Sequence, residues 1–153
     1  MELIDTPDIA LTCDVAGVPC SPKNIAWKAA QRYLDAAGLT DGVQIHIEKR
    51  IPMEAGMGGG STDGAAVLLA LQELTGNALS MDKLAEIAVS LGADVPFFLY
   101  GGTAYAAGIG EKLEKLPAFS TDCMVIAKGT AGVSTAQAYG CLLYTSPSPR
   151  DCS

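Results

Sequence analysis

Residues 56–62 carry the strongest chemical signal in this sequence. Glycine occupies four of the five positions from Gly56 to Gly60, and two hydroxyl residues, Ser61 and Thr62, follow at once. Glycine lets backbone N–H groups turn inward at φ values that other residues resist. The apolar run 65–71 then predicts a helix, whose first turn adds unpaired N–H donors and the positive end of a dipole. The segment therefore indicates a cradle for phosphate rather than a merely flexible loop.

This glycine segment differs from the two commonest phosphate motifs. A P-loop requires a lysine directly before the hydroxyl residue, and no lysine precedes Ser61. The dinucleotide fingerprint requires a glycine at the position of Ser61. The motif thus predicts phosphate binding without choosing a family.

Asp94 is the best candidate for a catalytic base. It lies between Gly92 and the apolar run 95–99, so we expect its carboxylate to be partly desolvated and its basicity changed. Phosphoryl transfer needs such a group to orient or deprotonate the attacking hydroxyl. The spacing equally allows Asp94 to cap a helical turn opened by Pro96, and the two roles are compatible.

Other polar residues have two readings each. Ser61 and Thr62 are candidate ligands of Mg²⁺ or of a phosphate oxygen, but either hydroxyl also suits a helix cap. Lys49 and Arg50 precede the glycine segment, where they either meet a nucleotide or end a strand in solvent. Tyr139 either stacks on a base or fills the core.

Two acidic residues beside glycines, Asp63 and Glu111, are weaker metal candidates. Solvated surface carboxylates are the commoner reason for such residues.

The composition favours one globular, cytoplasmic domain. The chain has 153 residues, 49% of them apolar, and a formal net charge of −7, which argues against nucleic acid and anionic membranes as partners. No apolar run reaches the roughly 20 residues of a membrane span, and the acidic start does not resemble a secretory signal. The five cysteines are scattered without a C-x-x-C pair, which indicates reduced thiols rather than a metal site.

Periodicity and capping residues predict an α+β fold. The expected elements are short strands within 1–20, a helix opened by Ser21-Pro22 and ended by Gly38, a strand at 43–47, a helix from the glycine segment to 75–76, a helix from Ser80 to Gly92, a strand pair at 103–106 and 112–116, a strand around 124–126, and a short helix from Ser134-Thr135 to Tyr139. Residues 142–153 are rich in serine and proline without periodicity, and we interpret them as a non-native tail from outside the coding frame.

Several segments together resemble the GHMP kinases. Residues 52–66 resemble the glycine-rich ATP motif of that family. A narrower resemblance is to its members that act on a cytidine diphosphate-linked methylerythritol. The segments that carry this second resemblance are 80–86, 91–99, 101–104, 108–111 and 133–136 with Tyr139.

The resemblance implies an ATP-dependent kinase that phosphorylates the 2-hydroxyl of the cytidyl-diphospho-methylerythritol in the non-mevalonate isoprenoid pathway. Its small-molecule substrate would contact Thr135 and Tyr139, Asp94 would be the catalytic aspartate, and Ser61 is a candidate Mg²⁺ ligand. The implied fold is α+β, like the second domain of ribosomal protein S5. The residues expected to hold the ATP phosphates are Pro52, Gly56, Gly58, Gly59, Gly60, Ser61 and Thr62.

The sequence also departs from the family pattern. The family pattern begins with a strand that carries a lysine and an asparagine, followed by an Asp-Gly-Tyr-His stretch, and residues 1–20 hold no equivalent. The family's C-terminal ferredoxin-like domain is also missing from this sequence. Gly64 stands where alanine is usual. We therefore expect 1–141 to be a central fragment, truncated at both ends. Its own activity and oligomeric state stay open, and the alternatives are another GHMP small-molecule kinase or a nucleotide-binding module without catalysis.

Overall fold

The computed structural model describes residues 1–121, 123–129, 132, 138 and 140. Thr135, Tyr139, the short helix expected at 134–139 and the tail 142–153 lie outside the described residues or largely so. The interpretations of these segments therefore stay predictions.

A three-stranded sheet forms one layer of the fold. Its strands are β1 (Glu2–Ile4), β2 (Ile9–Cys13) and β3 (Gly42–Ile47), in the order β1-β3-β2. β1 is antiparallel to β3, whereas β2 is parallel to it, with Leu11 opposite Ile45. Parallel neighbours need a crossover, and the helix α1 (Ile25–Ala37) provides it.

The first helix begins later than the sequence suggests. The expectation that Ser21-Pro22 opens it is wrong, because Ser21 instead accepts a hydrogen bond from the backbone N–H of Asn24 in a turn. Asn24 is the N-cap, and its side chain accepts from the N–H of Ala26 at 2.9 Å. The predicted end is confirmed: Gly38 adopts the left-handed conformation with a φ of 64°.

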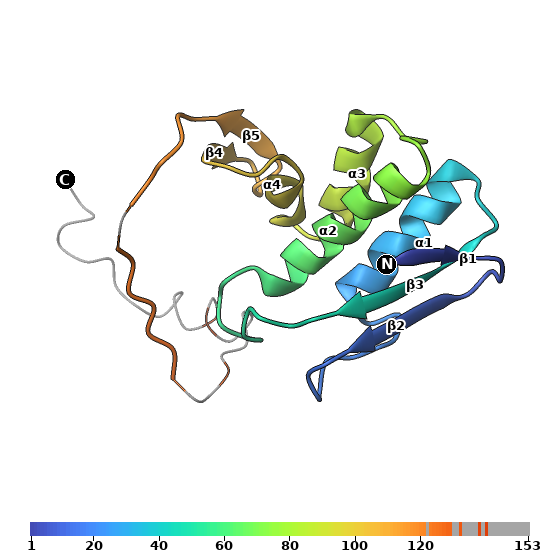
Figure 1. Ribbon diagram of the computed structural model, residues 1–153. Helices are drawn as coiled ribbons and strands as arrows, with labels where there is room; N and C mark the ends of the chain where they lie inside the picture. Colours follow the sequence, from blue (N-terminus) through green and yellow to red (C-terminus); the bar gives the residue numbers. More distant parts are fainter. Residues whose placement is uncertain (122, 130–131, 133–137, 139, 141–153) are drawn as a thin grey trace.

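Three more helices follow the sheet. They are α2 (Gly59–Leu74), α3 (Met81–Leu91) and α4 (Val95–Tyr100). The predicted cap of α3 is confirmed, because Ser80 accepts a hydrogen bond from the N–H of Lys83. Figure 1 shows α1, α2 and α3 on one side of the sheet.

The core lies between these helices and the sheet. Its apolar residues come from alternate positions of the strands and from the facing sides of the helices. The largest fully buried side chains are Tyr33, Leu68, Leu71, Leu84, Val43, Val95 and Pro96. The opposite face of the sheet is polar and carries Thr12 and His46, whose Oγ1 and Nδ1 atoms lie 2.8 Å apart.

The chain after α4 forms a hairpin and then leaves regular structure. Strands β4 (Ala104–Ala107) and β5 (Lys112–Lys115) pair antiparallel, as predicted. The strand expected at 124–126 is wrong: these residues form no strand, and Val125 is 88% exposed. Among the described residues, no helix combines the length and apolar character that a membrane crossing requires.

Candidate functional site

The glycine segment forms an open turn at the start of α2. Gly56 and Gly58 have φ values of 68° and 65°, which favour glycine. Gly58 is the N-cap of α2 and has no side chain to cap it. No backbone N–H from Gly56 to Ser61 donates a hydrogen bond to another described residue. These amides are therefore available to an external acceptor.

A cleft of about 940 Å³ opens at this turn. Its walls come from the segment before α1, the segment after β3, the glycine turn, the first turns of α2, the start of α4, and residues 127–129 and 138. Polar and charged residues in its lining are Lys23, Asn24, Lys49, Glu54, Ser61, Asp63, Asp94 and Lys128. Pro52 and Gly56 to Gly60 complete the side formed by the turn.

Asp94 lies at the N-cap position of α4 and lines this cleft. Its side chain makes no capping hydrogen bond, so the position matches the capping interpretation but the contact does not. The expected partial desolvation is wrong, because Asp94 is exposed. Its carboxylate therefore faces the same opening as the free amides and has no described hydrogen-bond partner there.

The two hydroxyl residues after the glycines point to different places. Ser61 lines the cleft. The hydroxyl of Thr62 donates to the carbonyl of Gly58 at 3.0 Å, and Thr62 is not among the lining residues. This back-bond occupies the hydroxyl within the helix, so the structure brings only Ser61 to the cleft.

Lys49, which the sequence left undecided, extends into the cleft. Its ammonium forms an ion pair with Asp63, and the two side chains are 8% and 22% exposed. A side-chain carbon built on Gly59 would lie 3.2 Å from Nζ of Lys49. The positive charge is thus at the first residue of α2.

Arg50 takes the opposite direction. It is 70% exposed and pairs with Asp14 and Glu48, each at 2.8 Å. Asp14 also accepts the backbone N–H of Lys49 at 2.7 Å. That hydrogen bond and then the guanidinium of Arg50 lower the pKa of Asp14 below its usual value. For Arg50, the solvated interpretation of the sequence agrees with the structure.

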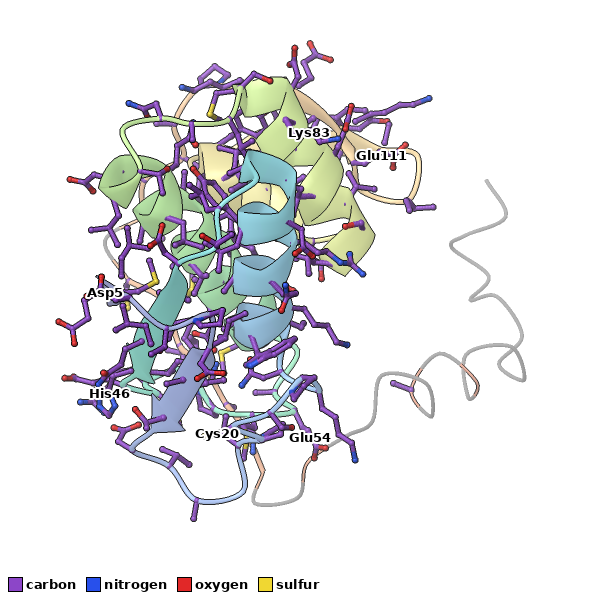
Figure 2. The ribbon with its side chains drawn as sticks, turned by 90° about the vertical axis from the view of Figure 1, so that its right-hand side faces the viewer. Asp5, Cys20, His46, Glu54, Lys83 and Glu111 are labelled. Atoms are coloured by element: carbon purple, nitrogen blue, oxygen red, sulfur yellow. The ribbon has the colours of Figure 1, made fainter. Side chains whose placement is uncertain are left out.

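The acidic candidate Glu111 serves a turn instead of the cleft. Its carboxylate accepts the backbone N–H of Ile109 at 2.7 Å, and backbone N–H donors lower its pKa, its own first and that of Ile109 next. Figure 2 shows Glu111 toward the top of the view and the cleft residue Glu54 toward the bottom, and Glu111 is not among the residues that line the cleft. Among the described residues, no three His, Cys, Asp or Glu side chains gather to hold a metal ion.

Comparison with known proteins gives consistent names for this arrangement. A family model described as "GHMP kinases N terminal domain" matches residues 24–102. A 4-diphosphocytidyl-2-C-methyl-D-erythritol kinase of Geobacter metallireducens is 49% identical over 145 residues, which cover 95% of this chain and 52% of that protein. A protein of the same name from Clostridium tetani is 42% identical and is covered to 49%. The chain thus spans about half the length of the curated relatives it matches.

Two solved structures are also similar. A crystal structure of a 4-(cytidine 5'-diphospho)-2C-methyl-D-erythritol kinase is 47% identical, with a TM-score of 0.59 over 74% of this chain and 41% of that one. A homoserine kinase from Cytophaga hutchinsonii is 24% identical, with a TM-score of 0.73 over 90% of this chain and 48% of that one. The second likeness concerns the fold alone.

Proposed function

This chain belongs to the GHMP kinase family, and on that premise we propose that it is the nucleotide-binding part of a small-molecule kinase. The proposed reaction transfers the γ-phosphoryl group of ATP to the 2-hydroxyl of 4-diphosphocytidyl-2-C-methyl-D-erythritol, in the non-mevalonate isoprenoid pathway. The names of the relatives support this substrate, since 49% identity extends over 95% of the chain.

One observation carries the proposal. The free amides of the glycine turn line the same cleft as Asp94, whose carboxylate makes no capping hydrogen bond to α4. The amides of Gly58, Gly59 and Gly60 are suited to the phosphates, since a helix N-terminus adds its positive dipole to them. Asp94 then orients the acceptor hydroxyl and takes its proton, while the hydroxyl oxygen attacks the γ-phosphorus and ADP leaves.

The donor set also fits a magnesium ion carried mainly by the nucleotide. Mg²⁺ in such sites keeps several waters and takes one or two carboxylates besides the phosphate oxygens. The cleft offers the hydroxyl of Ser61 and the carboxylate of Glu54 for this purpose, which leaves Asp94 for the acceptor hydroxyl. The ion would neutralise charge on the phosphates as the bond to ADP breaks.

A substrate pocket formed by Thr135 and Tyr139 is part of the same proposal. Ala127, Gly129 and Ala138 line the cleft, which supports an approach of this later segment to the glycine turn. A cytosine ring stacked on Tyr139 would use the aromatic face that the sequence suggested.

The test separates a kinase from a nucleotide-binding module. Mg-ATP binding and phosphoryl transfer are measured for this chain and for a chimaera in which it replaces the matching half of the Geobacter metallireducens relative. We expect ATP binding by both and transfer by the chimaera. Binding without transfer in the chimaera would rule out the kinase and support a nucleotide-binding module without catalysis.

The role of Asp94 is tested in the chimaera that transfers phosphate. Asp94→Asn should reduce turnover by at least about a hundredfold and spare ATP binding, since general base catalysis contributes on that order. Asp41→Asn is the matched control, because Asp41 is an exposed carboxylate that does not line the cleft. Turnover that survives Asp94→Asn rules out this aspartate as the base.

A further inference from the structure

We propose that Lys49 binds a phosphate oxygen of the nucleotide, and that Asp63 holds its ammonium group only while the cleft is empty. Binding then exchanges one anionic partner of the lysine for another. This inference rests on the proposed function and assigns a positioning role to Asp63, which does not touch the nucleotide in this scheme.

The burial of Lys49 is the first argument. Lysine is almost never buried unless it is paired, and this side chain is 8% exposed, pairs with Asp63 and lines the cleft. Its ammonium has three donors, and the only described acceptor is the carboxylate of Asp63. Two donors therefore remain for an oxygen-rich ligand.

The backbone around Lys49 fixes the direction of its side chain. Asp14 accepts the N–H of Lys49 at 2.7 Å and donates its own N–H to the carbonyl of Ile47 at 3.2 Å. Successive side chains of an extended segment point to opposite sides, so Arg50 turns to solvent while Lys49 enters the cleft. The lysine can exchange partners within the cleft without moving its backbone.

The location of the charge is the second argument. Nζ of Lys49 lies beside Gly59, the first residue of α2, so an anion held by the first amides of that helix would lie beside the ammonium. Asp63 is five residues into the same helix by count from Gly59, and its negative charge opposes such an anion. Transfer of the ammonium from the carboxylate to phosphate offsets that repulsion.

The overall charge favours a cation close to the glycine turn. The chain carries a net charge of −7, and Glu54, Asp63 and Asp94 all line the cleft. A P-loop would supply a lysine within its glycine motif, whereas here the residue directly before Ser61 is Gly60. Lys49 supplies the same kind of charge from the segment that follows β3.

The experiment measures binding of inorganic triphosphate and of Mg-ATP to this chain by calorimetry at low ionic strength. Lys49→Met should weaken both affinities by about tenfold or more, as for the loss of a charged hydrogen bond. Asp63→Asn should strengthen them by roughly threefold or more, because it releases the lysine and removes a repulsive charge. Arg50→Met, the neighbouring cation outside the cleft, should leave them within about twofold.

The opposite signs distinguish ligand binding from a structural clasp. If the pair only braces the fold, Lys49→Met and Asp63→Asn will both weaken binding and both lower the melting temperature. That outcome overturns the inference, as does unchanged binding by Lys49→Met. Lys49→Arg keeps the charge and should retain most of the affinity, which guards against misfolding of the methionine variant.

The same data separate this inference from the proposed function. If the unaltered chain binds neither triphosphate nor Mg-ATP, both fall. If it binds both ligands and Lys49→Met has no effect, only the role of Lys49 falls.

Discussion

The ring of Phe98 lies directly against Gly58. A side-chain carbon built on Gly58 would come within 2.8 Å of Cζ of Phe98, closer than real carbon contacts allow. The ring is itself held by Phe97, edge to face, with 5.3 Å between the centroids. The residue that caps α2 without a side chain thus has two reasons to be glycine, its φ of 65° and this contact.

Substitution at Gly58 should be more harmful than substitution at Gly56. Both have positive φ values, but only Gly58 has a neighbour within 4 Å of the added carbon. Gly56→Ala should cost about 1 kcal/mol of stability from backbone strain alone. Gly58→Ala should cost about 2–4 kcal/mol, because overpacking adds to the strain. Urea unfolding of the two variants measures the difference, and equal losses would show that the ring yields without cost.

Gly64→Ala should destabilise the chain although it removes a glycine from a helix. Alanine in a helix is worth about 1 kcal/mol more than glycine. The added carbon, however, would lie 2.6 Å from Cγ2 of Ile25, and a branched methyl so near the backbone cannot swing away. Overpacking of about 1–3 kcal/mol should therefore win.

The matched test for Gly64 uses Ile25→Ala as background. With Cγ2 removed, the same Gly64→Ala change should become neutral or stabilising in thermal or urea unfolding. A Gly64→Ala chain that is more stable than the original would contradict the packing argument.

Acid should weaken the interactions of Asp14 with the N–H of Lys49 and with Arg50. Its pKa is lowered in the folded chain, by the N–H of Lys49 first and then by Arg50, so its contribution to stability is present above the ordinary value of 3.8 and disappears as the pH falls through the lower folded value. Urea unfolding between about pH 6 and pH 2 should show the original chain more stable than Asp14→Asn at the upper end, with the difference shrinking toward the lower end. A difference that is constant with pH would mean that Asp14 titrates normally.

Tyr33→Phe should cost about 1–2 kcal/mol, the range for a buried hydroxyl that loses its partners. Tyr33 is fully buried, and its hydroxyl bonds to Oε1 of Gln72 at 2.7 Å and to Oγ1 of Thr75 at 2.6 Å. Tyr105→Phe is the control, because Tyr105 is 60% exposed. Equal unfolding free energies for the two variants would show that the hydroxyl of Tyr33 does not stabilise the fold.

Local sequence signals predicted the elements whose causes are local. Ser80 and Gly38 delimit helices through hydrogen bonds within a few residues, and the strand at 43–47 follows from its alternation. The first helix shows where this fails. Ser21-Pro22 has the stronger capping pattern, but Ser21 is used by a turn and Asn24 takes over the cap.

Signals that depend on distant partners could not be predicted in the same way. Residues 124–126 have the apolar character of a strand, but a strand needs a neighbour to share its backbone hydrogen bonds, and none is found among the described residues. The parallel pairing of β2 with β3 likewise depends on how α1 packs.

In the candidate site too, some features followed from residue types and others needed the three-dimensional structure. The free amides of the glycine turn follow from residue types, and the structure agrees. The choice between Lys49 and Arg50 required the end of β3 and its contact with Asp14, and the difference between Ser61 and Thr62 required the back-bond to Gly58. Lys49 and Arg50 were thus distinguished by a contact with a residue far away in the sequence, and Ser61 and Thr62 by a hydrogen bond within one helical turn.

The short helix α4 joins the two halves of the proposed chemistry. Asp94 stands at its start, and Phe98, four residues later, touches the glycine turn, a rise of about 6 Å along one helical turn. In the proposed reaction, this one helical turn would fix the distance between the carboxylate at its start and the glycine turn that Phe98 contacts. A helical turn keeps its rise when the helix shifts as a unit, so the proposed base and the contact with the glycine turn would move together.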